Sequence, residues 1–437
     1  MKNKTINIGI IGFGTVGASA VRIIQENREK VEMRAGGSIN IKSIADKDIT
    51  TPRKVNLAPG VLTTDAYKIL KDPEIDIVVE LIGGVEAAHK FIIEALKSGK
   101  HVVTANKAVL AKYWEEVMDT AKENNVEIYI EASVGAGIPV IQALHDGLAA
   151  NNIKSIYGIV NGTTNYMLTR MLEDKKDYKE VLKDAQKLGY AEADPSYDVD
   201  GMDAANKLVV LSSIAFDSVV DLKDVYVEGI SRITIKDMLD ARSLGYVIKL
   251  LAIAKDCGDG QYDVRVHPTL IPAEHQLAAI DDVFNGIFFV GDAVGPVMFY
   301  GQGAGGDSAA SAVVSDIIYI SRNIINGVAG KVPSVFFEKG AEKASIKPIS
   351  EVEFRYYTRF TVLDKPGVLA TIAGILGKYN ISISSVVQKE QDEGKRVPVI
   401  ITTDKALEKN MKQAIDEIDA LPVIKEKSLV IRIEKGE

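Results

Sequence analysis

The sequence is almost without cysteine: Cys257 is the only one in 437 residues. A disulfide within the chain is therefore impossible, and a metal site built from several cysteines is excluded. Such cysteine usage is typical of proteins in a reducing compartment, so we expect a cytoplasmic location. The chain also has no low-complexity segment and no internal repeat.

The sequence also lacks very long apolar runs and long runs of basic residues. No apolar run reaches the length of a membrane-spanning helix, which argues against a membrane protein. The formal net charge is −8 and there is no long basic run, which argues against nucleic acid as a partner. The first residues, MKNKTINIGIIGFG, start basic but become glycine-rich at once, so we expect a first strand rather than a signal peptide. The length and the hydrophobic fraction of 46% predict two or three domains with substantial cores.

A glycine-rich motif follows the first expected strand, which runs from Asn7 to Ile11. The motif is G-x-G-x-x-G at residues 12–17, and a helical stretch, ASAVRIIQEN, comes after it. This strand–loop–helix context is the one that a dinucleotide-binding motif requires. The glycines allow a tight turn, a close approach of the pyrophosphate to the backbone, and close packing of the helix on the strand.

The second expected strand, INIKSIAD, ends at Asp46, further from the glycines than the usual spacing of about 20 residues. Asp46 could hold the adenosine ribose of NAD. Lys47, Arg53 and Lys54 could instead hold the 2′-phosphate of NADP. All four residues are also compatible with a solvated loop, so the cofactor preference stays open at this point.

Strands and helices then alternate, as in an open parallel sheet whose ligands collect at the carboxyl ends of the strands. The stretch HVVTANK predicts a strand that ends with Thr104, Asn106 and Lys107. Lys107 is therefore a candidate cation in the site. The alternative is an ordinary lysine at a helix start.

Two further strand ends carry polar groups. A strand that ends at Glu131 leads into a glycine-rich bend at 134–137, whose carbonyl groups and one carboxylate could hold a small hard cation; the bend could also be a simple crossover between domains. Later, Asn161 to Thr164 stands at an expected helix N-terminus, which would suit a substrate carboxylate. Thr163 or Asn161 could equally be an ordinary N-cap.

The segment from Gly189 to Lys207 is where we expect the chemistry. It precedes LVVLSSIAF, an apolar run that predicts a buried helix with Asp200 as a candidate N-cap. Asp203 and Lys207 are four residues apart and share a helix face. Burial and a neighbouring carboxylate act in opposite directions on the proton affinity of a lysine, a balance that suits an acid/base group near neutral pH. The alternative is an exposed helix start with an ordinary ion pair.

The second half of the chain predicts two more structural regions. Several strands beyond Phe216 indicate a mostly antiparallel sheet, followed by the glycines of GQGAGG at 301–306 and a helix to about Asn326 that we expect to pack on the first domain. A polar linker marked by prolines comes next. From Phe354 the expected order is strand, helix, strand, strand, helix, strand, which is the ferredoxin-like order.

Together these motifs closely resemble the homoserine dehydrogenase family, in its long form with a C-terminal ACT domain. The matching motifs span essentially the whole chain: GFGTVG at 12–17, TANKA at 104–108, EASVGAGIP at 131–139, NGTTNY at 161–166, GYAEADP at 189–195, DVDGMDAANK at 198–207, GQGAGG at 301–306 and DKPGVL at 364–369. The resemblance implies an α/β protein with an N-terminal Rossmann domain, an α+β catalytic and dimerisation domain and a C-terminal ferredoxin-like ACT domain. The expected bounds are 1–133 with helix 305–327, 134–304, a linker at 328–353, and 354–437.

The resemblance also implies a reaction and a set of roles. The family interconverts L-homoserine and L-aspartate 4-semialdehyde with NAD or NADP, in threonine, methionine and isoleucine biosynthesis. Lys207 would be the acid/base residue, Asp203 would orient it, and Lys107 would lie between nicotinamide and substrate. The residues expected at the substrate are Gly162, Thr163, Tyr190, Glu192 and Asp198. Those expected at the dinucleotide are Gly12, Phe13, Gly14, Thr15, Val16, Gly17, Thr104, Lys107 and Gly303.

The remaining expectations from the resemblance concern an ion, an effector and assembly. Glu131 and the carbonyl groups of Val134, Ala136 and Ile138 would hold a structural sodium ion. The ACT domain would take an amino-acid effector, with threonine the first choice, and the chain would form a homodimer or a homotetramer.

Two other functions compete with this interpretation. A cysteine-dependent acylating semialdehyde dehydrogenase would share the Rossmann start but needs a cysteine nucleophile, and Cys257 is the sole candidate. A non-catalytic amino-acid sensor could retain the cofactor and ACT folds. The presence of both Lys207 and Glu192 argues against the sensor.

Overall fold

The computed structural model describes residues 4–258, 260–331, 343–388 and 395–435, and it divides into two compact units. The first unit comprises Met1–Ile156, Asn206–Lys223 and Val283–Ala344, and the second comprises Tyr157–Ala205, Asp224–Asp282 and Ser345–Glu437. The catalytic region of the sequence is thus shared between the units, so the expected domain bounds remain a prediction. Among the described residues, no helix combines the length and apolar character that a membrane span requires.

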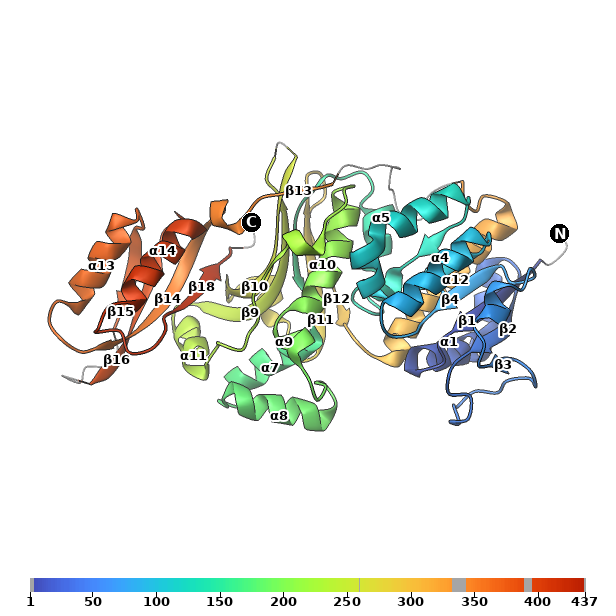
Figure 1. The fold of residues 1–437 in the computed structure, drawn as a ribbon, viewed down its shortest axis with the longest axis horizontal. Coiled ribbons are helices and arrows are strands. Elements are labelled where there is room, and N and C mark those ends of the chain that lie inside the picture. The colour runs from blue at the N-terminus through green and yellow to red at the C-terminus, as the bar shows by residue number, and fades with distance from the viewer. Residues whose placement is uncertain (1–3, 259, 332–342, 389–394, 436–437) are drawn as a thin grey trace. The chain divides into compact units, whose positions relative to one another are not determined.

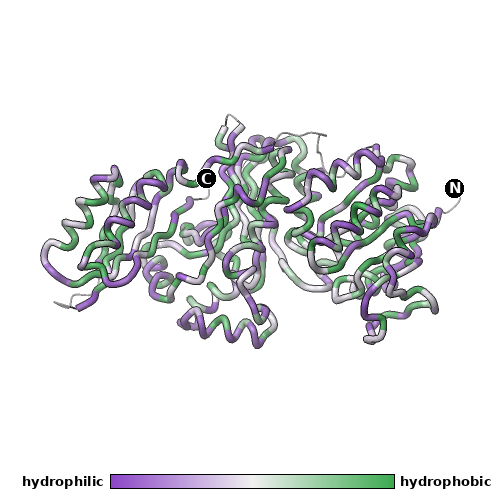
Figure 2. The backbone as a smooth tube through the Cα atoms, in the orientation of Figure 1, coloured by the Kyte–Doolittle hydropathy of each residue, from purple (hydrophilic) through white to green (hydrophobic). Residues whose placement is uncertain are grey.

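A parallel six-stranded sheet in the order β3-β2-β1-β4-β5-β6 forms the centre of the first unit (Figure 1). Its strands are β1 (Thr5–Ile11), β2 (Ser38–Ala45), β3 (Leu62–Thr63), β4 (Ile77–Glu80), β5 (His101–Thr104) and β6 (Ile128–Tyr129). The connecting helices are α1 (Thr15–Glu26), α2 (Arg28–Ala35), α3 (Tyr67–Leu70), α4 (Glu86–Lys97) and α5 (Lys107–Glu123). Helices cover both faces of such a sheet, so its central strands β1 and β4 are mostly apolar, as the hydropathy colours of Figure 2 show. The predicted Rossmann-type fold is confirmed.

Helix α12 (Gly306–Asn326) belongs to the same core although it lies far along the chain. Its buried residues, among them Val313 and Ile317, share one cluster with Ile8 of β1 and Val21 of α1. The expectation that this helix packs on the dinucleotide-binding part is therefore confirmed.

Shorter elements complete the first unit. They are η1 (Glu131–Ser133), α6 (Val140–Gln142), η2 (Ala143–Gly147), η3 (Leu222–Asp224, shared with the second unit at its last residue) and the antiparallel strands β11 (Phe284–Gly291) and β12 (Gly295–Gln302). Strand β7 (Ile153–Ile159) and helix α10 (Met202–Ala215) each continue from one unit into the other.

The second unit contains a long sheet that runs from the end of β7 through β9, β10, β18, β14 and β16 to β15. Its strands are β9 (Tyr246–Asp256), β10 (Gln261–Pro272), β14 (Glu353–Leu363), β15 (Ile383–Val387), β16 (Arg396–Thr403) and β18 (Leu429–Ile433), with the short strands β8 (Tyr226–Val227), β13 (Ser345–Ile346) and β17 (Ala406–Leu407) beside them. Its helices are α7 (Gly162–Glu173), α8 (Tyr178–Leu188), α9 (Ser196–Val199), α11 (Ile235–Ser243), η4 (Gln276–Ala279), η5 (Ile349–Glu351), α13 (Val368–Lys378) and α14 (Glu408–Asp419). The antiparallel pairing of β9 with β10 confirms the expected sheet beyond Phe216.

The C-terminal part of this unit has the predicted ferredoxin-like topology. Its strands are ordered β18-β14-β16-β15, and α13 and α14 lie together on one face of them (Figure 1). A separate apolar cluster, which includes Phe360, Leu376 and Ile418, fills the space between helices and strands. Residues 332–342 of the expected linker lie outside the described residues.

Candidate functional site

The glycine-rich loop has the geometry of a phosphate cradle. Gly12 has φ +108, and a side chain there would lie 2.6 Å from the carbonyl oxygen of Leu81. Gly17 lies directly against the carbonyl of Gly12, which allows helix and strand to touch. Gly14, by contrast, faces open space and is the N-cap of α1, where no side chain bonds the first helical amides. Open space beside an uncapped helix N-terminus fits a dinucleotide pyrophosphate.

Asp46 and Arg53 both bind this loop through Phe13. The Asp46 carboxylate accepts a hydrogen bond from the Phe13 amide at 2.5 Å, and the Arg53 guanidinium donates to the Phe13 carbonyl at 2.7 Å. The same guanidinium lies 5.0 Å from the centre of the Phe13 ring. Lys47 and Lys54 are exposed. Four charged residues were candidates for the adenosine end of the dinucleotide. Two of them, Asp46 and Arg53, contact the glycine-rich loop.

The GQGAGG segment meets the first helix at Gly306, which sequence reasoning did not single out. A side chain at Gly306 would lie 2.5 Å from the Thr15 methyl group. The next residue, Asp307, accepts hydrogen bonds from Ser19 and Arg22 of α1, both at 2.7 Å. Gly303, the expected cofactor contact, packs so closely on Asn285 that no side chain fits there.

Glu80, also missed from the sequence, organises the carboxyl ends of β4 and β5. It is fully buried and accepts from the Thr104 hydroxyl at 2.6 Å and from the Ile82 amide at 2.8 Å. The Thr104 oxygen in turn accepts from the amide of Asn106, the N-cap of α5. Lys107 is the first residue of α5, so Glu80 fixes the backbone that presents this lysine.

Burial raises the pKa of the Glu80 carboxyl to about 7 from an ordinary value of 4.5. The stability that this group contributes is therefore fully present below pH 4.5 and is lost as the pH rises through 7. We expect Glu80→Gln to match the wild-type chain in stability near pH 4.5 and to exceed it by about 3 kcal/mol above pH 7. Urea unfolding at several pH values measures this difference. The same change at the exposed Glu115 of α5 is the control, and parallel stability curves for Glu80→Gln would contradict the expectation.

The expected substrate residues of the second unit gather around Asn161, the N-cap of α7. The Asn161 oxygen accepts from the Thr164 amide at 2.8 Å, which is ordinary capping. Its amide nitrogen donates to the carboxylates of Asp198 at 2.7 Å and Asp203 at 2.8 Å. Asn161 is 5% exposed. The sequence offered capping as its role, whereas the structure shows one side chain that aligns the helix end with both carboxylates.

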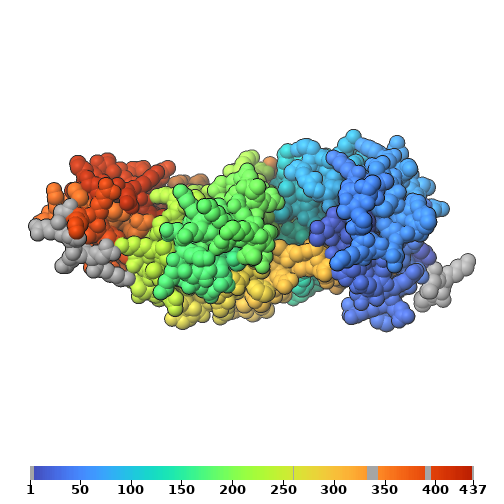
Figure 3. Space-filling view, turned by 90° about the horizontal axis from the view of Figure 1, so that it is seen from below, coloured from blue at the N-terminus to red at the C-terminus, as the bar shows by residue number. Residues whose placement is uncertain are grey.

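Tyr190, in the segment after α8, lies near this helix end, and Glu192 follows it by two residues. The Thr163 hydroxyl donates to the Tyr190 carbonyl at 2.6 Å, and the Tyr190 ring lies 5.0 Å from that of Tyr166. Glu192 is exposed. Figure 3 shows the segment that contains α7 and α8 (green) on the surface, where an amino-acid substrate could reach an exposed carboxylate.

Helix α10 starts later than expected. It begins at Met202, after Gly201 with φ +88, and Asp200 caps the C-terminus of α9 instead. The prediction of Asp200 as its N-cap was wrong because the glycine lets the chain turn between the two helices. Asp203 is buried in the first turn, and Lys207, one turn later, is half-buried.

The expected cation residues surround a bend with two left-handed residues, Gly135 and Ala136. Glu131 does not end a strand as expected: β6 stops at Tyr129, and Glu131 begins η1. Its buried carboxylate accepts from the Ile141 and Gln142 amides at 3.0 and 2.7 Å, and so it caps α6.

A second buried carboxyl lies beside Glu131. The Glu131 amide donates to Asp316 at 3.0 Å, and burial raises the pKa of both carboxyl groups. A cavity of about 30 Å³ adjoins both residues. Among the described residues there is no group of three histidine, cysteine or acidic side chains that could hold a metal, so the expected cation site stays a prediction.

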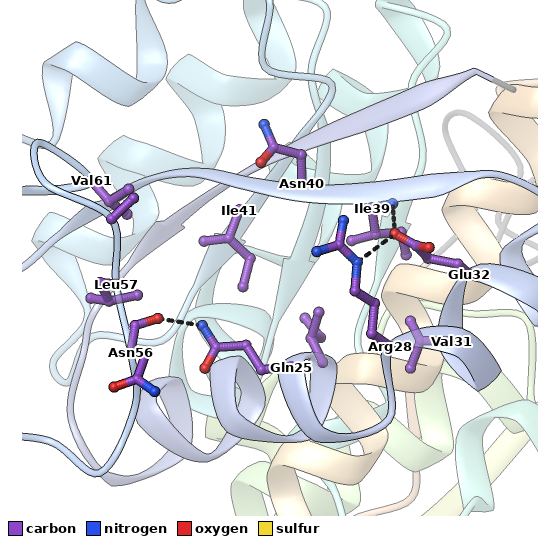
Figure 4. A pocket seen from close by; sticks show the side chains of 12 residues that line it. Gln25, Arg28, Val31, Glu32, Ile39, Asn40, Ile41, Asn56, Leu57 and Val61 are labelled. Atoms are coloured by element: carbon purple, nitrogen blue, oxygen red, sulfur yellow. Dashed lines mark hydrogen bonds and ion pairs between the residues drawn. The ribbon is translucent and has the colours of Figure 1, made fainter.

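A larger cavity, of about 330 Å³, lies elsewhere in the first unit, between α1, α2 and β2 (Figure 4). Its floor is apolar, with Val31 and Ile41, and Arg28 bonds Glu32 at its rim at 3.1 Å. None of the predicted site residues lines it.

Cys257 is exposed and follows β9 directly. Its thiol group is nevertheless partly buried, and this partial burial raises its pKa, whereas a nucleophilic cysteine needs its pKa lowered. The structure therefore gives no support to a cysteine-dependent reaction.

A parallel sheet with a glycine-rich loop at a helix N-terminus defines the class: a dinucleotide-binding protein, here an NAD(P)-dependent oxidoreductase. Comparison with known families agrees. Residues 12–131 match the model "Homoserine dehydrogenase, NAD binding domain", residues 139–318 match "Homoserine dehydrogenase", and residues 356–422 match "ACT domain". The chain belongs to the homoserine dehydrogenase family.

Similar proteins cover the chain from end to end. Homoserine dehydrogenases of Bacillus subtilis and of a Synechocystis strain are 41% and 43% identical to it, over 99% and 98% of this chain and 99% of each relative. The crystal structure of a homoserine dehydrogenase from Thiobacillus denitrificans superposes with a TM-score of 0.94 at 43% identity, covering 99% of both chains. A hyperthermophilic archaeal homoserine dehydrogenase in complex with NADPH is 29% identical over 72% of this chain and 97% of its own, with a TM-score of 0.61.

The predicted function follows from this membership. The protein interconverts L-homoserine and L-aspartate 4-semialdehyde, with NAD or NADP as the hydride carrier. Neither the cysteine-dependent dehydrogenase nor the non-catalytic sensor is supported.

Proposed function

We propose that Lys207 is the acid/base residue of this reaction and that Asp203 orients it. The observation that carries the proposal is the position of both on α10, one helical turn apart, with Asp203 bound to Asn161 at 2.8 Å. A steady-state assay with L-homoserine and NADP+ or NAD+, followed by the absorbance of the reduced nicotinamide, tests the function. Absence of turnover with either dinucleotide would contradict it.

The reaction requires the transfer of a hydride and of a proton, and different groups carry out these two transfers. The bound dinucleotide supplies the hydride acceptor or donor. When the alcohol is oxidised, Lys207 takes the hydroxyl proton, and in the reverse direction it returns a proton to the aldehyde oxygen. Lys107 presents a second cation near the reacting oxygen. Gly162 and Thr163, at the N-terminus of α7, bind the substrate carboxylate, and Tyr190 lines the substrate beside them. Glu192 binds the substrate ammonium group, and Asp198 supports the same pocket.

Glu192 contacts the substrate ammonium in this proposal. Because the contact exists in both ground and transition states, Glu192→Gln is expected chiefly to raise KM for L-homoserine, about tenfold, with kcat nearly unchanged. The control is Asp194→Asn, a change of the exposed acid two residues away. An unchanged KM in Glu192→Gln would move the ammonium site elsewhere, with Asp198 the next candidate.

We propose that Arg53 makes the protein prefer NADP to NAD, because it binds the 2′-phosphate at the adenosine end of the dinucleotide. Its guanidinium is held at the glycine-rich loop by the Phe13 carbonyl, and guanidinium groups bind phosphate well. Arg53→Ala is expected to raise KM for NADP+ about tenfold while KM for NAD+ changes little. Lys54→Ala, a change at an exposed neighbour, should preserve the ratio. Equal losses for both dinucleotides would contradict this role.

We also propose a structural sodium ion at Glu131 and the carbonyl groups of Val134, Ala136 and Ile138. All four ligands are oxygen atoms, which suit a hard cation. Two buried carboxyl groups, Glu131 and Asp316, stand close enough to gain from a positive charge. Replacement of sodium chloride by choline chloride should lower the melting temperature of the wild-type chain but not of Glu131→Gln.

We propose a cytoplasmic homodimer or homotetramer whose ferredoxin-like C-terminal domain binds an amino acid, with L-threonine the first candidate. The Asp364–Gly367 turn supports an amino-acid site because it opens α13 at the end of β14, where amides could bind a carboxylate. Inhibition by millimolar L-threonine tests the effector.

A further inference from the structure

Three adjacent strands of the second unit connect the C-terminal domain to α7. We call α7 the substrate helix, because its N-terminus is the proposed site of the substrate carboxylate. Strand β10 pairs with β18 of the C-terminal domain on one side and with β9 on the other. Thr269 of β10 is the partner of Arg432 in β18 and of Lys249 in β9. These three residues therefore stand in one row across three strands.

Buried charges fix β18 on its neighbours. Arg432 is 4% exposed and binds Glu228 at 2.9 Å, as well as Glu408 at the start of α14. Arg265 of β10 is fully buried and pairs with Asp263 and with Glu434, the residue after β18. Loss of one partner from such a pair leaves a buried charge uncompensated, so these pairs disfavour any other register of β18.

At the other end of the row, Lys249 supports the first turn of α7. Its ammonium group is buried and donates to the Ile280 carbonyl at 2.5 Å, to Asp281 at 3.0 Å and to the Asn165 side-chain oxygen at 3.3 Å. Asn165 also donates to the carbonyl groups of Ile280 and Asp282. A displacement of Lys249 would therefore break bonds on both α7 and the loop at 280–282.

Asn165 lies one turn from the substrate end of α7. The backbone amide of Asn165 donates to the backbone carbonyl of Asn161 at 3.2 Å. The side-chain amide of Asn161 in turn donates to the carboxylates of Asp198 and Asp203. We propose that Lys249 is a positioning residue for substrate binding, and that the C-terminal domain acts on the substrate helix through β18, β10 and Lys249. The inference rests on the proposed roles of the α7 N-terminus and its carboxylates.

A ligand of the C-terminal domain changes substrate affinity through this route only if it binds two arrangements of β18 unequally. The row supplies the physical connection that such coupling needs, because each step is a backbone pairing or a buried hydrogen bond rather than a mobile surface contact.

The test begins with Lys249→Met, which keeps the chain length and removes the ammonium. We expect KM for L-homoserine to rise about tenfold while KM for the dinucleotide stays within about twofold. Lys183→Met is the matched control: Lys183 is an exposed lysine of the neighbouring helix α8, and its variant should leave both KM values within about twofold. A folded Lys249→Met with unchanged homoserine KM, or with equal rises of both KM values, overturns the proposal.

The second arm uses Arg432→Lys, which keeps the charge but loses the two-pronged pairing with Glu408. Hydrogen exchange should show faster exchange in α7 and unchanged exchange in β1 and β2. In the double variant with Lys249→Met, the rise in homoserine KM should be clearly less than the product of the two single effects, because both act through one row. Unchanged exchange in α7, or fully multiplicative effects, overturns the route. The exchange result does not depend on turnover, so a failure of the proposed function would be visible separately as an inactive wild-type chain.

Discussion

Lys207→Ala is expected to reduce kcat at least about a hundredfold, because the hydroxyl proton then has no positioned acceptor. Dinucleotide affinity should stay unchanged, since the glycine-rich loop and α1 are untouched. The measurement is steady-state turnover of L-homoserine, together with dinucleotide binding followed by fluorescence. The loss should be in kcat and in kcat/KM alike, which is the pattern of an interaction made in the transition state.

The control for Lys207 is Lys223→Ala. Lys223 is an exposed lysine shortly after α10, and it pairs with Asp221 at 3.2 Å. Its loss should leave kcat within about twofold, because surface pairs contribute little. Near-normal kcat in Lys207→Ala would remove this residue from the acid/base role and leave Lys107 as the remaining lysine candidate.

The second large effect is expected at Asn161. Asn161→Asp keeps an oxygen that can cap α7, since aspartate and asparagine cap equally well, but it replaces the amide donor with an acceptor. Three carboxylates would then meet at the site of Asp198 and Asp203. We expect kcat/KM for L-homoserine to fall about a hundredfold or more, and the remaining activity to shift toward lower pH, where one of the three carboxyl groups carries a proton.

The comparison variant is Thr164→Val. Thr164 is buried and its hydroxyl lies 2.9 Å from the Asn161 oxygen, but no carboxylate contact of Asn161 depends on it. We expect a loss of stability of about 1 kcal/mol and a change in kcat/KM of less than about threefold. If Asn161→Asp has no larger effect than Thr164→Val, Asn161 serves only as an N-cap.

Local pattern was sufficient for most of the helices and strands and for the family, but not for the start of α10 or the end of β6. The glycines at 12–17 predict a phosphate cradle because only glycine tolerates the positive φ of Gly12 and the contact at Gly17. The six-element order after Phe354 predicts the ferredoxin-like topology because each strand or helix leaves its own periodicity in the sequence. Lys207 and Asp203 were predicted to lie together because a spacing of four residues brings side chains to one helix face, and both do lie on α10.

Contacts between distant segments were decided only by the tertiary structure. Asn161 looked like a helix cap, and its second role depends on two aspartates that follow it by 37 and 42 residues. Glu80 is the last residue of β4, and its partner Thr104 is 24 residues away in the sequence. The row of Arg432, Thr269 and Lys249 depends on which strands pair with one another. The sequence of a strand shows no pattern that identifies its partner strand. The sequence by itself determined the local elements and the chemistry they could carry; burial and strand pairing decided which polar groups meet, because both depend on the packing of the whole chain.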